Sequence, residues 1–199
     1  MKKKLMLVVT ALSIAVLFSS CGKAPQAEID AANAAIEAAK AVGADVYVAE
    51  DFAALQDSMN AVNENVEAQN AKLFKNFSKV TEQLVVVNQM AVETQAKAET
   101  RKAEVKLEIE ALQAEVSSIL LENNDLVAKA PKGKEGAAAL EAIKSDISLI
   151  ETSVGEVATL VANDNLIPAL DKVKAAKEKA VAINTELNEV IAKYTKSRR

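Results

Sequence analysis

The feature that most constrains this fold is a long segment, from Gly43 to Pro131, whose interior contains no glycine and no proline. Apolar residues recur along it from Phe52 at alternating spacings of three and four, the heptad pattern of helices that pack side by side. As one helix, residues 52–128 would be about 115 Å long, and such a helix cannot bury its own apolar stripe. The segment therefore predicts paired helices. The first seam consists of Phe52, Leu55, Met59, Val62, Val66, Gln69, Leu73, Asn76, Val80, Gln83, Val87 and Met90.

This seam contains three amides, and a second seam follows out of step with it. Gln69, Asn76 and Gln83 are either core positions that set the register or, as we favour, signs of a seam that is only partly buried. The second seam begins at Val105, four residues beyond a whole number of heptads from Phe52. Either a stutter in a continuous coiled coil or a bend near 94–101 would produce that offset. The second seam consists of Val105, Ile109, Leu112, Val116, Ile119 and Leu126.

The flanking segments predict further helices. A helix is expected over 27–42 and ends at Gly43, since glycine favours the position after a helix. A turn over 43–48 leads to the helices of 49–128, so that 27–130 forms one long helical region. The asparagines, Pro131 and two glycines predict a loop within 121–136. Helices over 137–162 and 168–195, joined at Asn163-Asp164-Asn165, complete an antiparallel hairpin. The predicted fold is all-α, with elongated antiparallel hairpins in a coiled-coil-like bundle.

The amino terminus has the organisation of a bacterial secretion signal. Three lysines precede an uncharged apolar stretch over 5–18, which is too short to span a membrane as a helix. The next residues resemble the lipobox of bacterial lipoproteins, which implies removal of residues 1–20 and acylation of Cys21. Residues 21–26 would then form a lipidated tether. The alternative is an ordinary secretory signal followed by a buried or free cysteine. The lipobox-like run is Leu17-Phe18-Ser19-Ser20-Cys21.

A second resemblance covers residues 27–60. They are similar to a short helical-hairpin domain of unknown function found in Gram-negative envelope lipoproteins, which implies no activity. The matching residues are Ala31, Ala32, Ala34, Ile36, Ala38, Ala39, Gly43, Ala44, Tyr47, Phe52 and Met59.

Charge and composition exclude several function classes. The mature chain would carry 21 basic and 28 acidic residues, without a basic cluster on a folded segment, so we expect no nucleic-acid binding. The chain has no histidine and one cysteine, so the usual ligands of zinc and iron–sulfur sites and the usual nucleophile–base pairs are missing. Glu108 and Glu110 do not face each other on a helix, and we interpret them as solvated surface. We therefore expect no catalytic residues, no metal and no cofactor.

The sequence favours a membrane-anchored, non-enzymatic structural or interaction protein of the cell envelope. We expect a lipid anchor at Cys21, in the outer membrane and facing the periplasm. Expected partners are an envelope protein, a second copy of the chain, or peptidoglycan. The basic end Lys196-Ser197-Arg198-Arg199 resembles that of the murein lipoproteins but lacks their final lysine, which favours electrostatic over covalent contact with the cell wall. The alternative is a carrier that holds an apolar ligand between helices, lined by Leu120, Leu121, Leu140, Ile143, Ile147 and Ile150.

Overall fold

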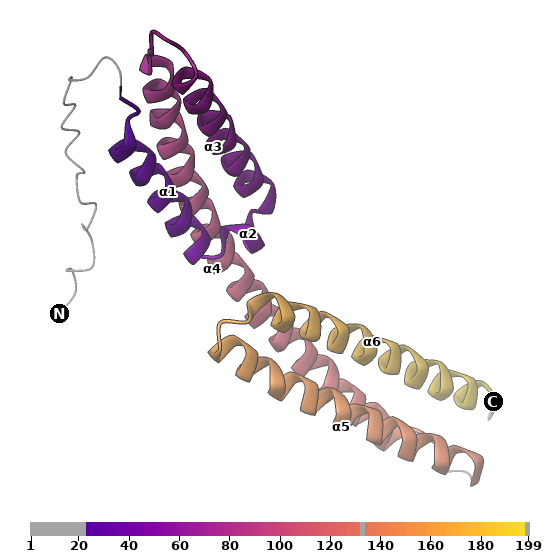
Figure 1. Cartoon of the computed structure of the whole chain (residues 1–199). Helices are drawn as coiled ribbons and strands as arrows, with labels where there is room; N and C mark the ends of the chain where they lie inside the picture. Colours follow the sequence, from indigo (N-terminus) through magenta and orange to yellow (C-terminus); the bar gives the residue numbers. More distant parts are fainter. Residues whose placement is uncertain (1–22, 132–133, 198–199) are drawn as a thin grey trace, which may run out of the picture.

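A computed structural model describes residues 23–131 and 134–197 of this chain, and within them it contains six helices (Figure 1). The helices are α1 (Gln26–Ala41), α2 (Ala44–Tyr47), α3 (Ala49–Asn70), α4 (Ser78–Lys129), α5 (Lys134–Ala162) and α6 (Leu166–Ser197). The predicted all-α fold is confirmed. Two bundles share α4, which runs through both as one helix of 52 residues. The N-terminal bundle combines α1 to α3 with the first part of α4, and the C-terminal bundle combines the rest of α4 with α5 and α6.

In the N-terminal bundle, α3 and α4 pack antiparallel in a heptad register. The side chains of Asp51 and Lys97 form an ion pair at 2.5 Å between Oδ1 and Nζ. Seven residues further along α3, the Ser58 hydroxyl donates a hydrogen bond to Met90 Sδ at 3.5 Å. Seven residues further again, Asn65 Nδ2 donates to Gln83 Oε1 at 3.0 Å. Each step forward on α3 is an equal step back on α4, which is the pairing that the heptads require.

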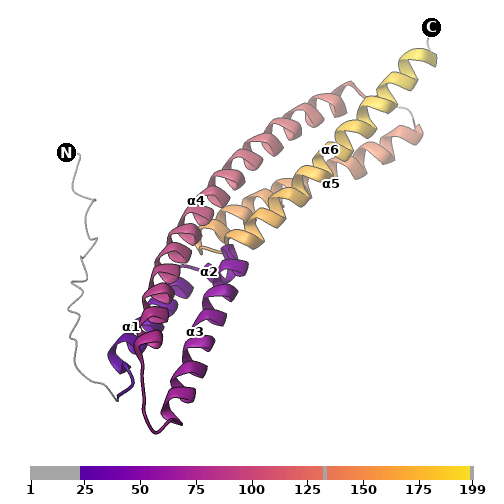
Figure 2. The same ribbon diagram turned by 90° about the horizontal axis from the view of Figure 1, so that it is seen from above.

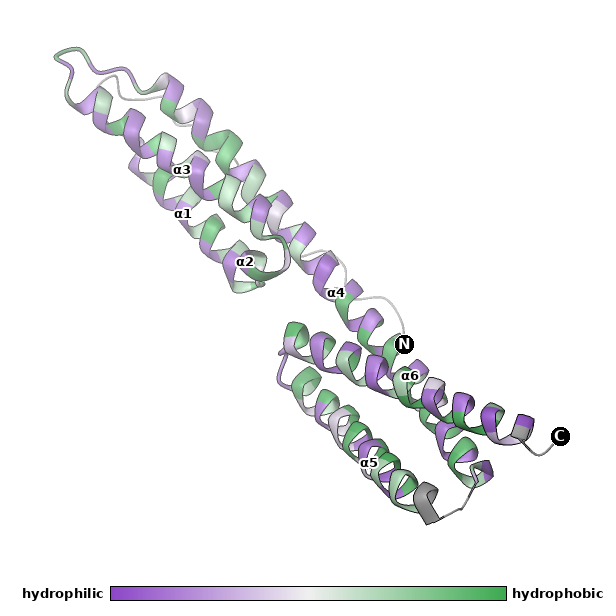
Figure 3. Cartoon of the chain, turned by 90° about the vertical axis from the view of Figure 1, so that its right-hand side faces the viewer, coloured by the Kyte–Doolittle hydropathy of each residue, from purple (hydrophilic) through white to green (hydrophobic). Residues whose placement is uncertain are grey.

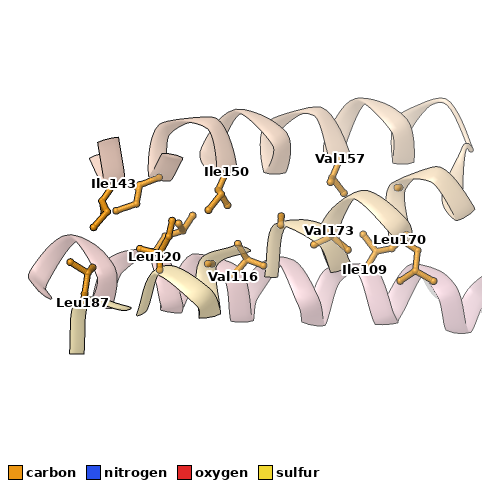
Figure 4. Close-up of a cluster of buried hydrophobic side chains, with 14 of the residues drawn as sticks. Ile109, Val116, Leu120, Ile143, Ile150, Val157, Leu170, Val173 and Leu187 are labelled. Carbon is orange, nitrogen blue, oxygen red and sulfur yellow. The ribbon is translucent and has the colours of Figure 1, made fainter. Parts of the chain in front are cut away.

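The C-terminal bundle has a different topology, because α6 runs parallel to α4 and α5 runs antiparallel to both (Figures 1 and 2). The α4–α6 pairs advance together along both helices, from Glu108 with Lys174 to Asn123 with Ala180. The core between the three helices is aliphatic, and Figure 4 shows its side chains pointing toward one another. Its fully buried members include Ile109, Val116, Val157, Leu166, Val173 and Leu187.

The junction between the bundles depends on a glycine and a tyrosine. Gly43 has a φ of +88°, in the left-handed region that favours glycine, and this lets the chain turn from α1 into α2. A Cβ at Gly43 would lie 2.9 Å from the Tyr47 ring. Tyr47 in turn packs against the C-terminal core, so this turn links the two bundles.

The structure corrects the predicted course of the long segment. The chain reverses over 71–77, so the seam through Leu73 is wrong; this side chain is 91% exposed. Residues 94–101 are helical and lie within α4, which continues without a break and curves between the two bundles (Figure 2). The four-residue offset lies within α4, because Val105 follows Val87 by 18 residues, four more than two heptads. Val87 packs in the N-terminal core and Val105 in the C-terminal core, so the offset coincides with the change of partner helices. The part of the predicted loop from 121 to 129 is also helical, and Asn123 is fully buried.

Candidate functional site

The predicted lipidation site, Cys21, lies outside the described residues. The first described residue, Lys23, is exposed, and it precedes α1 at the outer end of the N-terminal bundle. The reversal between α3 and α4 lies at the same end in both views (Figures 1 and 2). The C-terminal bundle lies at the other end.

An open groove with a volume of about 740 Å³ lies between α5 and α6. The opposite side of this helix pair is filled by α4, whereas the groove faces solvent. Its lining is largely apolar and includes Leu149, which is 62% exposed. Small residues line the α6 side, and charged residues form the rim. The alanines are Ala175, Ala176 and Ala182; the charged residues are Asp146, Asp171, Lys172, Lys179 and Glu186.

Most of the aliphatic stripe that we expected to line a ligand cavity is part of the C-terminal core. Ile143, Ile147, Ile150 and Leu120 are buried in the C-terminal core, where they pack with α4 and α6. Leu121 is 71% exposed on α4. The predicted lining is therefore wrong, although Ile150 also contributes to the α5–α6 groove.

Glu108 and Glu110 have different surroundings in the structure. Lys174 of α6 donates a hydrogen bond to Glu108 at 2.8 Å, and this bond lowers the pKa of Glu108. Arg101 lies 4.0 Å from the same carboxylate. Glu110 is exposed. The pair does not form an acid–base site; Glu108 instead links α4 to α6. Among the described residues, no group of acidic or other ligating side chains is arranged to hold a metal ion.

A polar cluster at the junction brings together α2, α4 and the turn between α5 and α6. Lys102 of α4 forms an ion pair with Asp164, which lies in the α5–α6 turn with a φ of +60°. Burial raises the pKa of Tyr47, with Lys102 opposing and Asp164 adding to that effect. The hydrogen bond to Asp164 raises the pKa of Lys102. These contacts give the cluster a structural role, because every charged member already has a partner.

One amide, Asn123, is buried between α4 and α6, and a second, Asn184, is half-buried on α6. Asn123 is fully buried, and its Nδ2 donates to the Ala180 carbonyl at 2.8 Å. Its Oδ1 and the Nδ2 of Asn184, one turn beyond Ala180, have no partner. A polar pair in an apolar seam favours one register over the shifted ones. The sequence marked Asn123 as a loop residue and missed this position.

No protein-family model, curated protein or solved structure matches this chain.

The sequence did not predict the open groove between α5 and α6 or the exposed reversal at 71–77. Leu149 and the alanines follow no motif, and only the placement of α4 shows which face of the α5–α6 hairpin stays open. The reversal at 71–77 did carry a signal. Asn76 and Ser78 are residue types that begin helices, and Asn76 Oδ1 accepts a hydrogen bond from the Ser78 backbone N–H at 2.9 Å.

Proposed function

We propose that this protein is a lipid-anchored bacterial envelope lipoprotein that acts as a helical spacer and interaction protein, without enzymatic activity. The observation that carries the proposal is α4, one helix that belongs to both bundles. At about 1.5 Å per residue it is roughly 78 Å long. A shared helix of that length holds the groups at its two ends apart more rigidly than a flexible linker would.

The placement of the chain ends supports this use of the spacer. Lys23 lies two residues after Cys21, at the outer end of the N-terminal bundle (Figure 1). Acyl chains on Cys21 would hold this end at a bilayer, since each buried methylene contributes about 0.8 kcal/mol. None of the helices in the described part of the chain is long and apolar enough to span a bilayer, and Figure 3 shows polar and apolar residues on every helix. We place the anchor in the outer membrane, with the C-terminal bundle in the periplasm.

The partner-binding surface that we propose is the groove between α5 and α6. Small side chains such as Ala175 and Ala182 allow a close approach, and a third helix already fills the opposite face of the same pair. A helix of another envelope protein is the occupant that this shape favours. The charged rim would fix its direction.

Two variants test the groove. Leu149→Glu places a charge in the groove lining, and Leu121→Glu is the matched control, because both leucines are exposed on helices of the same bundle. In a crosslinking pull-down from the native membranes, we expect Leu149→Glu to lose the partner and Leu121→Glu to keep it. Equal capture by both variants would refute the groove as the binding surface.

The groove also supports the second candidate function, a carrier of an apolar ligand. Leu149, Ile150 and Ile183 would contact the ligand, and Lys172 or Lys179 would contact an acidic headgroup. A fluorescent fatty acid titrated into the protein distinguishes the two functions. Saturable binding that Leu149→Glu abolishes would favour the carrier, and no binding would favour the interaction protein.

Lipidation is tested at Cys21 itself. We expect the parent and Ser20→Ala, which keeps a small residue before the cysteine, to incorporate labelled palmitate and to partition into detergent. Cys21→Ser should do neither. A Cys21→Ser protein that stays processed and in the detergent phase would refute the anchor.

A further inference from the structure

The reversal between α3 and α4 carries two bare apolar side chains at the outer end of the N-terminal bundle. We call residues 71–77 the apical loop. Leu73 is 91% exposed and Phe74 is 87% exposed, more than any other large apolar side chain in the described part of the chain. Adjacent side chains of this size, left in water, are typical of a surface that meets a partner or a membrane.

The loop is held in place, so the exposure does not result from a loose segment. The backbone N–H of Asn76 donates to Gln69 Oε1 at 3.3 Å, and Asn76 Oδ1 accepts from Ser78 as described above. Phe77 is 7% exposed and packs into the core of the N-terminal bundle. Burial of Phe77 fixes the base of the loop, while Leu73 and Phe74 project from its tip.

Unpaired positive charge surrounds these two side chains. Lys72 and Lys75 flank them directly, and Lys79 is the second residue of α4. Within the described residues, none of the three lysines forms an ion pair, although acidic residues outnumber basic ones in the whole chain. Lys72, Phe74 and Lys79 line a hollow of about 580 Å³, together with Gln69, Asn76, Ser78 and Glu82.

We propose that the apical loop inserts Leu73 and Phe74 into an anionic lipid bilayer, with Lys72, Lys75 and Lys79 at the level of the phosphates. Exposed apolar tips ringed by lysine match the two layers of a membrane surface, apolar chains below and negative headgroups above. The loop and Lys23 lie at the same end of the molecule, so both contacts face one membrane (Figures 1 and 2). The proposal builds on the membrane location proposed above and adds a second contact that sets the orientation of the rod.

A tryptophan at the tip tests the proposal without the lipid anchor. The chain has no native tryptophan, so Phe74→Trp gives a single reporter, and Val92→Trp, at a 65% exposed position further along α4, gives the control. Both are made in residues 21–199 with Cys21→Ser, which retains every described residue. On vesicles of phosphatidylcholine and phosphatidylglycerol in equal parts, we expect a blue shift and quenching by brominated acyl chains for Phe74→Trp alone.

Vesicle flotation then separates the apolar and electrostatic contributions. We expect Leu73→Ser with Phe74→Ser to weaken binding by roughly tenfold or more. Neutralising Lys72 and Lys75 to glutamine should cost about fivefold for each lysine on anionic vesicles, with little effect on pure phosphatidylcholine. Val92→Ser should bind like the parent.

Three outcomes would overturn the proposal. The first is no flotation of the parent on anionic vesicles. The second is an equal blue shift for Val92→Trp. The third is a dimer in solution that disappears in the double serine variant, because the occupant would then be a second copy of the loop. Since Cys21 is absent from all these proteins, the result is independent of whether the natural chain is lipidated.

Discussion

At the scale of single residues, α4 offers two aliphatic side chains, two positions apart, in opposite environments. Ile109 is 1% exposed in the C-terminal core, and Leu107 is 66% exposed. We expect Ile109→Ala to lower the free energy of unfolding by about 2–5 kcal/mol, from lost burial and the cavity left behind. Leu107→Ala should change it by less than about 0.5 kcal/mol. Urea denaturation of both variants measures the difference, and similar values would contradict the assigned face of α4.

Two glycines form a second matched pair. Gly43→Ala should destabilise the fold by about 1–3 kcal/mol, because alanine at positive φ is strained and its Cβ would meet the Tyr47 ring. Gly155 lies inside α5 with open space around it. Gly155→Ala should therefore stabilise by about 0.5–1 kcal/mol, since alanine is the better helix former. Thermal melts compare the two, and a Gly43→Ala protein as stable as the parent would refute the strained turn.

The ion pair between Glu108 and Lys174 predicts a pH effect. The hydrogen bond from Lys174 lowers the pKa of Glu108 in the folded chain. The unfolded glutamate therefore takes up its proton at a higher pH than the folded one. The contribution to stability is present above the unfolded pKa and is lost as the pH falls through the folded pKa. Carboxyl NMR should find the pKa of Glu108 raised in Lys174→Met, and an unchanged value would exclude this ion pair as the cause.

Residue patterns predicted the buried faces better than the turns. Ile109, Val116, Val80 and Val87 were placed in seams from spacing alone, and all are buried. Spacing did not distinguish Leu73, which continues the same pattern but lies in the apical loop. A heptad pattern records where apolar residues occur and cannot tell whether the chain reverses between them.

At the scale of whole helices, the absence of glycine and proline did not keep α3 and α4 continuous. The two helices reverse over 71–77 because their antiparallel pairing buries Leu55, Met59, Leu84 and Val87, which one straight helix would leave in water. Tertiary burial therefore outweighs local helix propensity here. The same argument explains why α4 does not break near 94–101. Thr94 and Ala98 are buried against the N-terminal bundle, and Val105 continues the stripe into the next core.

A proline in α4 tests its role as the shared helix. Thr100 is exposed on α4, between Ala98 of the N-terminal core and Val105 of the C-terminal core. Thr100→Pro removes one backbone hydrogen bond and clashes with the preceding turn, so we expect a loss of about 3 kcal/mol or more. Thr100→Ala is the control and should be close to neutral. Circular dichroism melts measure both, and equal midpoints would mean that α4 is not continuous in solution.

At the scale of the whole molecule, the groove between α5 and α6 and the apical loop lie at opposite ends of α4. The polar cluster of Tyr47, Lys102 and Asp164 spans the place where the bundles meet, and α4 passes through it without interruption. Two bundles on one helix therefore form an elongated molecule, and we propose that one end contacts the membrane and the other binds the partner. The sequence alone does not predict either surface. Each is exposed because the neighbouring helices pack elsewhere, and only the structure shows that packing.

The last prediction is the size of this elongated molecule in solution. A compact domain of about the length of residues 23–199 would have a radius of gyration near 16 Å. A rod as long as α4, at roughly 78 Å, would have a value of about 22 Å. We expect small-angle X-ray scattering of residues 21–199 with Cys21→Ser to give more than about 20 Å, with a distance distribution that has a long tail. Thr100→Pro should change that distribution more than Thr100→Ala does, because a kink between the cores moves one bundle relative to the other. A value near 16 Å for the parent would mean that the bundles fold back on each other, and a spacer could then not hold its two ends apart.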